Sequence, residues 1–185
     1  MGKKEPNGEE LSTTRTDPRE VETTDKVVWC ALQDGSFEAF DLASKTSIYH
    51  HKSSFTSGAL SAIAYSEDDS LLATGSTSGL IEVYDIRALG SPVVSFKRNA
   101  ASIEDMTFIN CGQGGASLAI VTEDGLPFIA GVDADGLEVV AELVGGDCDG
   151  LRAIHAGGPE SGDIWTAGDD GIVRKYQVAT DVSVE

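Results

Sequence analysis

Few residues of this chain have the types and the spacing that catalysis requires. Its three histidines are His50, His51 and His155. Adjacent residues of a strand face opposite sides of a sheet, so His50 and His51 cannot act together, and His155 is far away in the sequence. The segment 158–162 does not carry the Gly-X-Ser-X-Gly pattern of a nucleophile elbow, and no phosphate-binding loop or Cys-X-X-Cys pair occurs. The sequence therefore predicts a protein that is not an enzyme and has no catalytic residues.

Metal and cofactor sites are also not expected. The run 133–136 resembles the start of a calcium loop, but Leu137 and Val144 stand where such a loop needs oxygen ligands. A hairpin turn accounts for this run better. The cysteine count of 3 is odd and lacks metal-type spacing, which favours free thiols in a reducing compartment. With no long apolar run and no secretory signal, we expect a cytoplasmic and nuclear protein without metal or cofactor.

Carboxylates are the abundant groups that could bind a partner. The chain has 31 acidic and 13 basic residues, a formal net charge of -18. Four basic and seven acidic groups lie in the first 25 residues, so -15 of this charge belongs to the remainder. Such a surface repels phosphate backbones, which argues against nucleic-acid binding and favours a basic protein partner. The alternative is that the acidity only keeps a β-rich protein soluble.

The elements that must position these carboxylates form a repeat. Gly35, Gly79, Gly125 and Gly171 are separated by 44, 46 and 46 residues, and Asp or Ser precedes each of them. An apolar, strand-like run follows each glycine. A period of ~40–45 residues with four short strands is typical of a β-propeller blade. Because the segment 72–87 (LATGSTSGLIEVYDIR) is a clear WD-repeat segment, we predict an all-β fold of the WD40-type β-propeller class.

The repeat divides the chain into four units, at roughly residues 26–52, 59–98, 102–144 and 150–178. The second and third units have four predicted strands each. The first unit has no evident first strand and the fourth no last strand, so the propeller is partial, with about three and a half blades of an expected seven. Residues 1–25 contain Leu11 and Val21 as their only large apolar groups, which predicts a disordered polar arm before a propeller at 26–179. Residues 180–185 are a tail.

The ring predicted from these units is open. WD propellers complete their last blade with a strand from the opposite end of the chain, and the polar arm cannot supply one. We therefore expect this chain to be the C-terminal half of a longer propeller. An open arc exposes strand edges and blade faces, which predicts self-association through the open propeller edges. Trp29 and Trp165, both on second strands, are expected to pack in the core between blades.

Three segments resemble the last blades of one WD-repeat family. They are residues 83–94 (VYDIRALGSPVV), 139–149 (VVAELVGGDCD) and 169–178 (DDGIVRKYQV). In order and spacing they are similar to the proteasomal ATPase-associated factor family, and the resemblance covers roughly residues 26–178. It implies a seven-bladed, non-enzymatic assembly chaperone of the proteasome regulatory particle, which binds an ATPase subunit of the base. The arm before residue 26 then corresponds to a loop inserted in a mid-propeller blade, and the first half of the propeller is absent.

A binding face follows from the order of the strands. In a propeller, the turns between second and third strands emerge on the same face as the loops between blades. The acidic residues predicted there, as a partner-binding site, are Asp34, Glu123, Asp124, Asp147, Asp149, Asp169 and Asp170. Exposed carboxylates can steer a basic domain, here the C-terminal region of a base ATPase subunit. The alternatives are acidic turns chosen for turn propensity, a generic WD-repeat scaffold of another complex such as a ubiquitin-ligase adaptor, and a truncated chain without independent activity.

Overall fold

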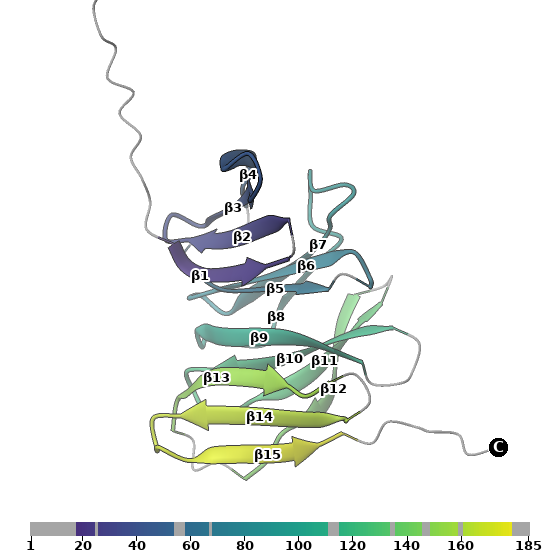
Figure 1. Ribbon diagram of the computed structural model, residues 1–185. Coiled ribbons are helices and arrows are strands. Elements are labelled where there is room, and N and C mark those ends of the chain that lie inside the picture. The colour runs from purple at the N-terminus through teal and green to yellow at the C-terminus, as the bar shows by residue number, and fades with distance from the viewer. Residues whose placement is uncertain are drawn as a thin grey trace, which may run out of the picture.

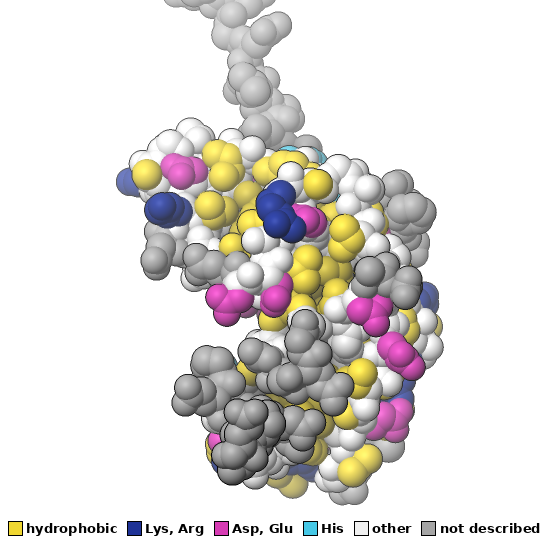
Figure 2. All heavy atoms as spheres, turned by 90° about the vertical axis from the view of Figure 1, so that its right-hand side faces the viewer, with side chains coloured by type: hydrophobic (Ala, Val, Ile, Leu, Met, Phe, Trp, Pro, Cys, Tyr) yellow, Lys and Arg dark blue, Asp and Glu magenta, His cyan; other side chains and the backbone are white. Residues whose placement is uncertain are grey.

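The computed structural model describes residues 18–24, 26–53, 58–66, 68–110, 115–133, 136–145, 149–158 and 161–178. These residues form four antiparallel sheets and contain no helix. Accordingly, this part of the chain has no helix long and apolar enough to cross a membrane. The sheets are stacked in chain order, from blade 1 to blade 4, in an arc (Figure 1). Figure 2 shows that the arc is hollowed on one side and is not a closed ring.

Each blade pairs its strands in sequence order, as in a meander. Blade 1 contains β1 (Pro18–Thr23), β2 (Val27–Leu32), β3 (Ser36–Asp41) and β4 (Thr46–Lys52). Blade 2 contains β5 (Leu60–Ser66), β6 (Leu71–Ser76), β7 (Leu80–Asp85) and β8 (Val94–Lys97). Blade 3 contains β9 (Ile103–Asn110), β10 (Ala116–Thr122), β11 (Phe128–Asp133) and β12 (Gly136–Glu142). Blade 4 contains β13 (Leu151–Ala156), β14 (Asp163–Gly168) and β15 (Val173–Gln177).

Blade 1 has a first strand that the sequence analysis missed. β1 pairs with β2 from Pro18↔Leu32 to Thr23↔Val28. The expected disordered arm of residues 1–25 is therefore wrong over residues 18–23, and so is the expectation that the first unit lacks its first strand. The physical reason is that β1 has one aliphatic residue, Val21, and is held by backbone pairing rather than by an apolar face. Residues 1–17 and 180–185 lie outside the described residues.

The glycine turns that revealed the repeat are confirmed. Gly35, Gly79, Gly125 and Gly171 all have positive φ, between 70° and 82°. The N–H of each donates to the carbonyl three residues earlier, at 3.0–3.2 Å. At Gly79 an added Cβ would lie 2.4 Å from the carbonyl oxygen of Asn99. Only glycine fits there, because both the backbone angle and the space exclude a side chain.

Three hydrophobic clusters join successive blades. The first includes Trp29 and Phe37 of blade 1 and Tyr84 of blade 2. The other two join blade 2 to blade 3 and blade 3 to blade 4 in the same way. Trp29 is 7% exposed, which confirms its predicted core role, whereas Trp165 is 40% exposed. The prediction for Trp165 is therefore wrong, because no blade in the described part of the chain follows blade 4.

Candidate functional site

The turns after the second strands and the loops between blades lie together. The N–H groups of Thr77, Glu123 and Asp169 donate to the carbonyls of Ala59, Ser102 and Gly150, at 3.0, 3.0 and 2.9 Å. Each bond joins such a turn to the interblade loop that enters the same blade. We call this rim the turn face; it consists of turns 33–35, 77–79, 123–125 and 169–171 with the described loop residues 58–59, 98–102 and 149–150. In Figure 1 it lies on the left.

The turn face contains six of the seven predicted site residues. Asp34, Glu123, Asp124, Asp169 and Asp170 lie in its turns, and Asp149 lies in the loop before β13. Asp147 is outside the described residues. The structure thus gathers these carboxylates on one rim but distributes them over blades 1, 3 and 4. Whether they bind a partner stays a prediction.

Two of these carboxylates stabilise their own turns. Asp34 accepts a hydrogen bond from the backbone N–H of Ser36 at 3.1 Å and another from its hydroxyl. These bonds, the hydroxyl first, hold the pKa of Asp34 below its ordinary value. Asp124 accepts from the hydroxyl of Thr122 at 2.6 Å and from the amide of Asn99 at 2.8 Å. Both residues therefore have a structural role that turn chemistry explains.

Two further carboxylates are paired with arginines. The Arg152 guanidinium lies 2.8 Å from Asp169 and 2.7 Å from Glu104. Arg174 is 2.5 Å from Asp170, with both side chains largely buried. The hydrogen bonds from these arginines lower the pKa of Asp169 and of Asp170. Because each already lies beside a guanidinium, Asp169 and Asp170 are weaker candidates for a basic partner than the sequence indicated.

Glu123 and Asp149 remain as the accessible carboxylates of the turn face. Both side chains are exposed. Among the described residues, no Lys, Arg or His lies within ion-pair distance of either of them. An exposed and uncompensated carboxylate costs little to hold and is available to a cationic partner. The sequence identifies both residues as candidates, but it does not show that they lack the arginine partners that Asp169 and Asp170 have.

A pair of acidic residues on the inner strands was missed by the sequence analysis. Glu20 on β1 accepts a hydrogen bond from the N–H of Ile63 on β5, at 2.9 Å. Asp105 on β9 accepts one from the N–H of Ile154 on β13, at 2.8 Å. Burial, together with the negative charge of Asp105, raises the pKa of Glu20 to about 8. Burial also raises the pKa of Asp105, and the two side chains are hydrogen-bonded to each other.

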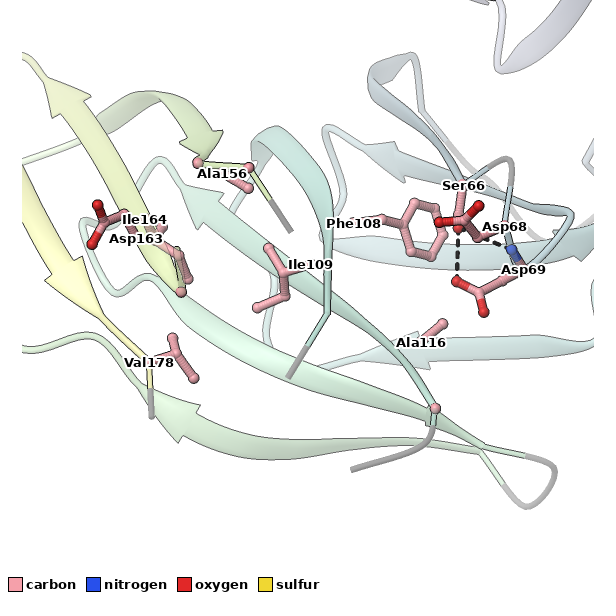
Figure 3. A pocket seen from close by; sticks show the side chains of 14 residues that line it. Ser66, Asp68, Asp69, Phe108, Ile109, Ala116, Ala156, Asp163, Ile164 and Val178 are labelled. Atoms are coloured by element: carbon pink, nitrogen blue, oxygen red, sulfur yellow. Dashed lines mark hydrogen bonds between the residues drawn. The ribbon is translucent and has the colours of Figure 1, made fainter. Parts of the chain in front are cut away.

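A cavity of about 320 Å³ lies on the rim opposite the turn face (Figure 3). Figure 3 shows apolar side chains, among them Phe108 and Ile109, between acidic groups at its two ends. Asp69 accepts a hydrogen bond from Ser66 at 2.7 Å, and Asp163 pairs with Lys175 at 2.8 Å. The described lining contains no His, Cys, Lys or Arg. The Ser66–Asp69 bond joins residues three positions apart in the turn between β5 and β6, which is ordinary turn chemistry.

Metal-ligating side chains do not converge in the described part of the chain. No group of three His, Cys, Asp or Glu residues there has the proximity that a metal ion needs. The run 133–136, which resembles a calcium loop, is the hairpin turn between β11 and β12, with Asp133 opposite Gly136. The N–H of Gly136 donates to the carboxylate of Asp133 at 3.1 Å. The hairpin interpretation of this run is therefore confirmed.

Solved structures identify the architecture. A structure of U3-55K matches 89% of this chain with a TM-score of 0.76 and 22% sequence identity, and 50% of its own length is covered. The RRP9 WD40 repeats match 89% of this chain with a TM-score of 0.76 and 21% identity, and 49% of them is covered. The fold is a partial WD40 β-propeller. The predicted fold class is thereby confirmed, and the chain spans about half the length of these two proteins.

A third structure has the extent of this WD40 arc. The computationally designed Ika4 protein matches 91% of the chain with a TM-score of 0.70 and 15% identity, and 96% of Ika4 is covered. The fold of this arc therefore also occurs in a chain of about the same size. No family model and no curated protein matches the sequence.

Proposed function

We propose that this chain is a non-enzymatic WD-repeat module whose turn face binds a basic region of a partner protein. The observation that carries the proposal is the exposure of Glu123 and Asp149 on that face, without a cation at ion-pair distance among the described residues. The formal net charge of -18 extends their effect, since the field of the whole protein attracts a cationic domain before contact. Such binding requires no catalytic group.

The resemblance of three segments, at 83–94, 139–149 and 169–178, supports a particular partner. In the proteasomal ATPase-associated factor family, the corresponding blades belong to an assembly chaperone of the regulatory particle. By this proposal the chain holds the C-terminal region of a base ATPase subunit in an assembly intermediate and masks the surface by which that subunit docks. The partner would place the chain in the cytoplasm and the nucleus. A generic scaffold role in another complex is the alternative, because the shared fold alone is compatible with many partners.

The test is a titration of the purified chain against the isolated C-terminal domains of the base ATPases, at low and at raised salt. We expect saturable binding to one domain, with an affinity that falls as salt rises, because salt screens exposed charges. Binding to none of them would refute the proteasomal partner. Binding that salt does not change would refute the turn-face mechanism, whichever protein is bound.

A further inference from the structure

The two ends of the arc expose sheet faces that every internal junction buries. Trp29, Ala73, Ala119 and Trp165 each stand six residues before the turn glycine of their blade, so they occupy one position of the repeat. The first three are 7%, 0% and 0% exposed, because the next blade covers them, whereas Trp165 is 40% exposed. The following blade thus buries this residue in blades 1 to 3. In blade 4, no segment in the described part of the chain buries it.

The junction between blades 1 and 2 demonstrates what covers this position. Trp29 stacks on Tyr65 of β5, with ring centroids 6.4 Å apart and an interplanar angle of 25°. Phe37, two residues after Gly35, packs on Tyr84 of β7 at 5.0 Å between centroids. The face of blade 1 that looks toward blade 2 therefore receives aromatic and aliphatic side chains of the following blade.

Blade 4 presents the same kind of face to solvent. The strand register pairs Trp165 with His155 on one side and Lys175 on the other. In the same way it pairs Ala167 with Ala153 and Val173, and all six side chains lie on one face of the sheet. We call these six residues the trailing face. Val173 is 64% exposed although its counterpart in blade 1, Phe37, is fully buried. Lys175 lies 5.2 Å above the ring of Trp165 and also pairs with Asp163 at 2.8 Å.

Blade 1 exposes the complementary face. Val21 on β1 pairs with Cys30, and Ile63 on β5 pairs with Thr74. Cys30 and Thr74 each stand five positions before the turn glycine of their blade, so Val21 and Ile63 occupy the same position of the repeat. Ile63 is 1% exposed and Val21 is 47% exposed. Val28, Glu38, Phe40 and Ile48 belong to the same side of blade 1, and with Val21 they form what we call the leading face. At the three internal junctions, a leading face of this kind packs on a trailing face.

We infer that the leading face of blade 1 binds the trailing face of blade 4 of a second copy of this chain. Three observations favour this occupant. The two faces are the halves of a junction that the chain already makes three times. Glu38 on the leading face is opposite in charge to Lys175 on the trailing face, a lysine that also pairs with Asp163 of its own blade. Each copy has one face of each kind, so a twofold axis makes both contacts at once and closes a ring of eight blades, which is within the usual size of propellers.

This association is independent of the turn face and responds to salt in the opposite direction. Its contacts are mainly apolar, and salt does not weaken burial of apolar surface. Both copies have a formal net charge of -18, so their mutual repulsion opposes assembly and salt screens it. Dimerisation therefore strengthens as salt rises, whereas binding of a basic domain to the turn face weakens.

The experiment is sedimentation of the 185-residue chain over a range of concentrations, at low and raised salt. A particle of twice 19.4 kDa is expected, with a dissociation constant that falls at raised salt. Val173→Glu places a charge in the trailing face and should weaken dimerisation by at least about tenfold. Val140→Glu is the matched control, because Val140 is 60% exposed on β12, away from both faces. Circular dichroism verifies that each variant is folded.

A mixing experiment fixes the orientation of the two copies. Val21→Glu should also prevent dimerisation, since each contact uses one leading and one trailing face. A mixture of the Val21→Glu and Val173→Glu chains has one intact contact, so it should form a heterodimer where neither variant forms a homodimer. A monomeric wild type at all concentrations and salts would overturn the proposal. So would an equal effect of Val140→Glu, or normal dimerisation of Val21→Glu, which would indicate contact between two trailing faces.

Discussion

The hydrogen-bonded Glu20 and Asp105 side chains make the stability of the arc depend on pH. The folded-state pKa of Glu20, about 8, lies above its ordinary value of 4.5, so the folded state holds the proton more tightly than the unfolded state does. The stabilisation is complete below about pH 4.5 and is lost as the pH rises through 8. Deprotonation places two negative charges on inner strands of blades 1 and 3.

The magnitude follows from this difference in pKa. Each pKa unit corresponds to about 1.4 kcal/mol, so the full difference would amount to about 5 kcal/mol. Glu20 is only half-buried, and water screens its charge, so we expect on the order of 2 kcal/mol. Glu20→Gln keeps the shape of the protonated acid. Its carbonyl can accept from the N–H of Ile63 and its amide can donate to Asp105.

The assay is denaturant unfolding of the wild type and of Glu20→Gln between pH 5 and pH 9. The wild-type free energy of unfolding should fall by on the order of 2 kcal/mol relative to the variant across this range, so the variant is the more stable protein at pH 9. Glu138→Gln, on the exposed side of β12, controls for the loss of one carboxylate. Parallel pH curves for the wild type and Glu20→Gln, or a variant that is less stable at pH 9, would refute the raised pKa of Glu20 in the folded state.

Two further predictions concern the turns and the turn face. Gly79→Ala should lower the free energy of unfolding by at least about 2 kcal/mol, because an alanine Cβ would meet Asn99 at a positive φ. Gly90→Ala has open space around it and should change stability by less than about 1 kcal/mol in the same melts; equal losses would contradict the turn assignment. Arg152→Met removes the cation beside Asp169, so the pKa of Asp169, followed by NMR, should rise toward its ordinary value, and a basic domain should bind more tightly at low salt. An unchanged Asp169 titration would show that the ion pair does not form in solution.

The repeat could be predicted from the sequence because its turns have a chemical requirement. Positive φ favours glycine at Gly35 and its counterparts, so the spacing of these glycines reports the blades directly. Units with strong apolar content are predicted closely: the third unit is predicted at 102–144, and blade 3 extends from Ile103 to Glu142. β1 was missed because its sequence, PREVET, has neither an apolar run nor an apolar alternation.

The position of the acidic residues on one face could be predicted from the sequence, but which of them are ion-paired could not. The turn glycines place Glu123 and Asp169 on one face, which follows from the sequence. The pairing of Arg152 with Asp169, 17 residues apart, depends on the register between β13 and β14. In the same way, the exposure of Trp165 depends on the lack of a following blade and not on its own strand. Contacts between distant segments therefore decide which carboxylates are free to bind, and these contacts require the structure.

The most direct test of the proposed function measures the affinity of the wild type and two variants for one basic domain. This domain is the one that binds the wild type most tightly in the titration of base ATPase domains. The Glu123→Gln/Asp149→Asn chain loses the two exposed carboxylates of the turn face. The Asp68→Asn/Glu138→Gln chain loses two exposed carboxylates elsewhere and so has the same net charge. We predict that the first variant binds about tenfold more weakly at low salt and has a flatter salt dependence, while the second stays within about twofold of the wild type. Equal affinities of the two variants would contradict a binding site on the turn face.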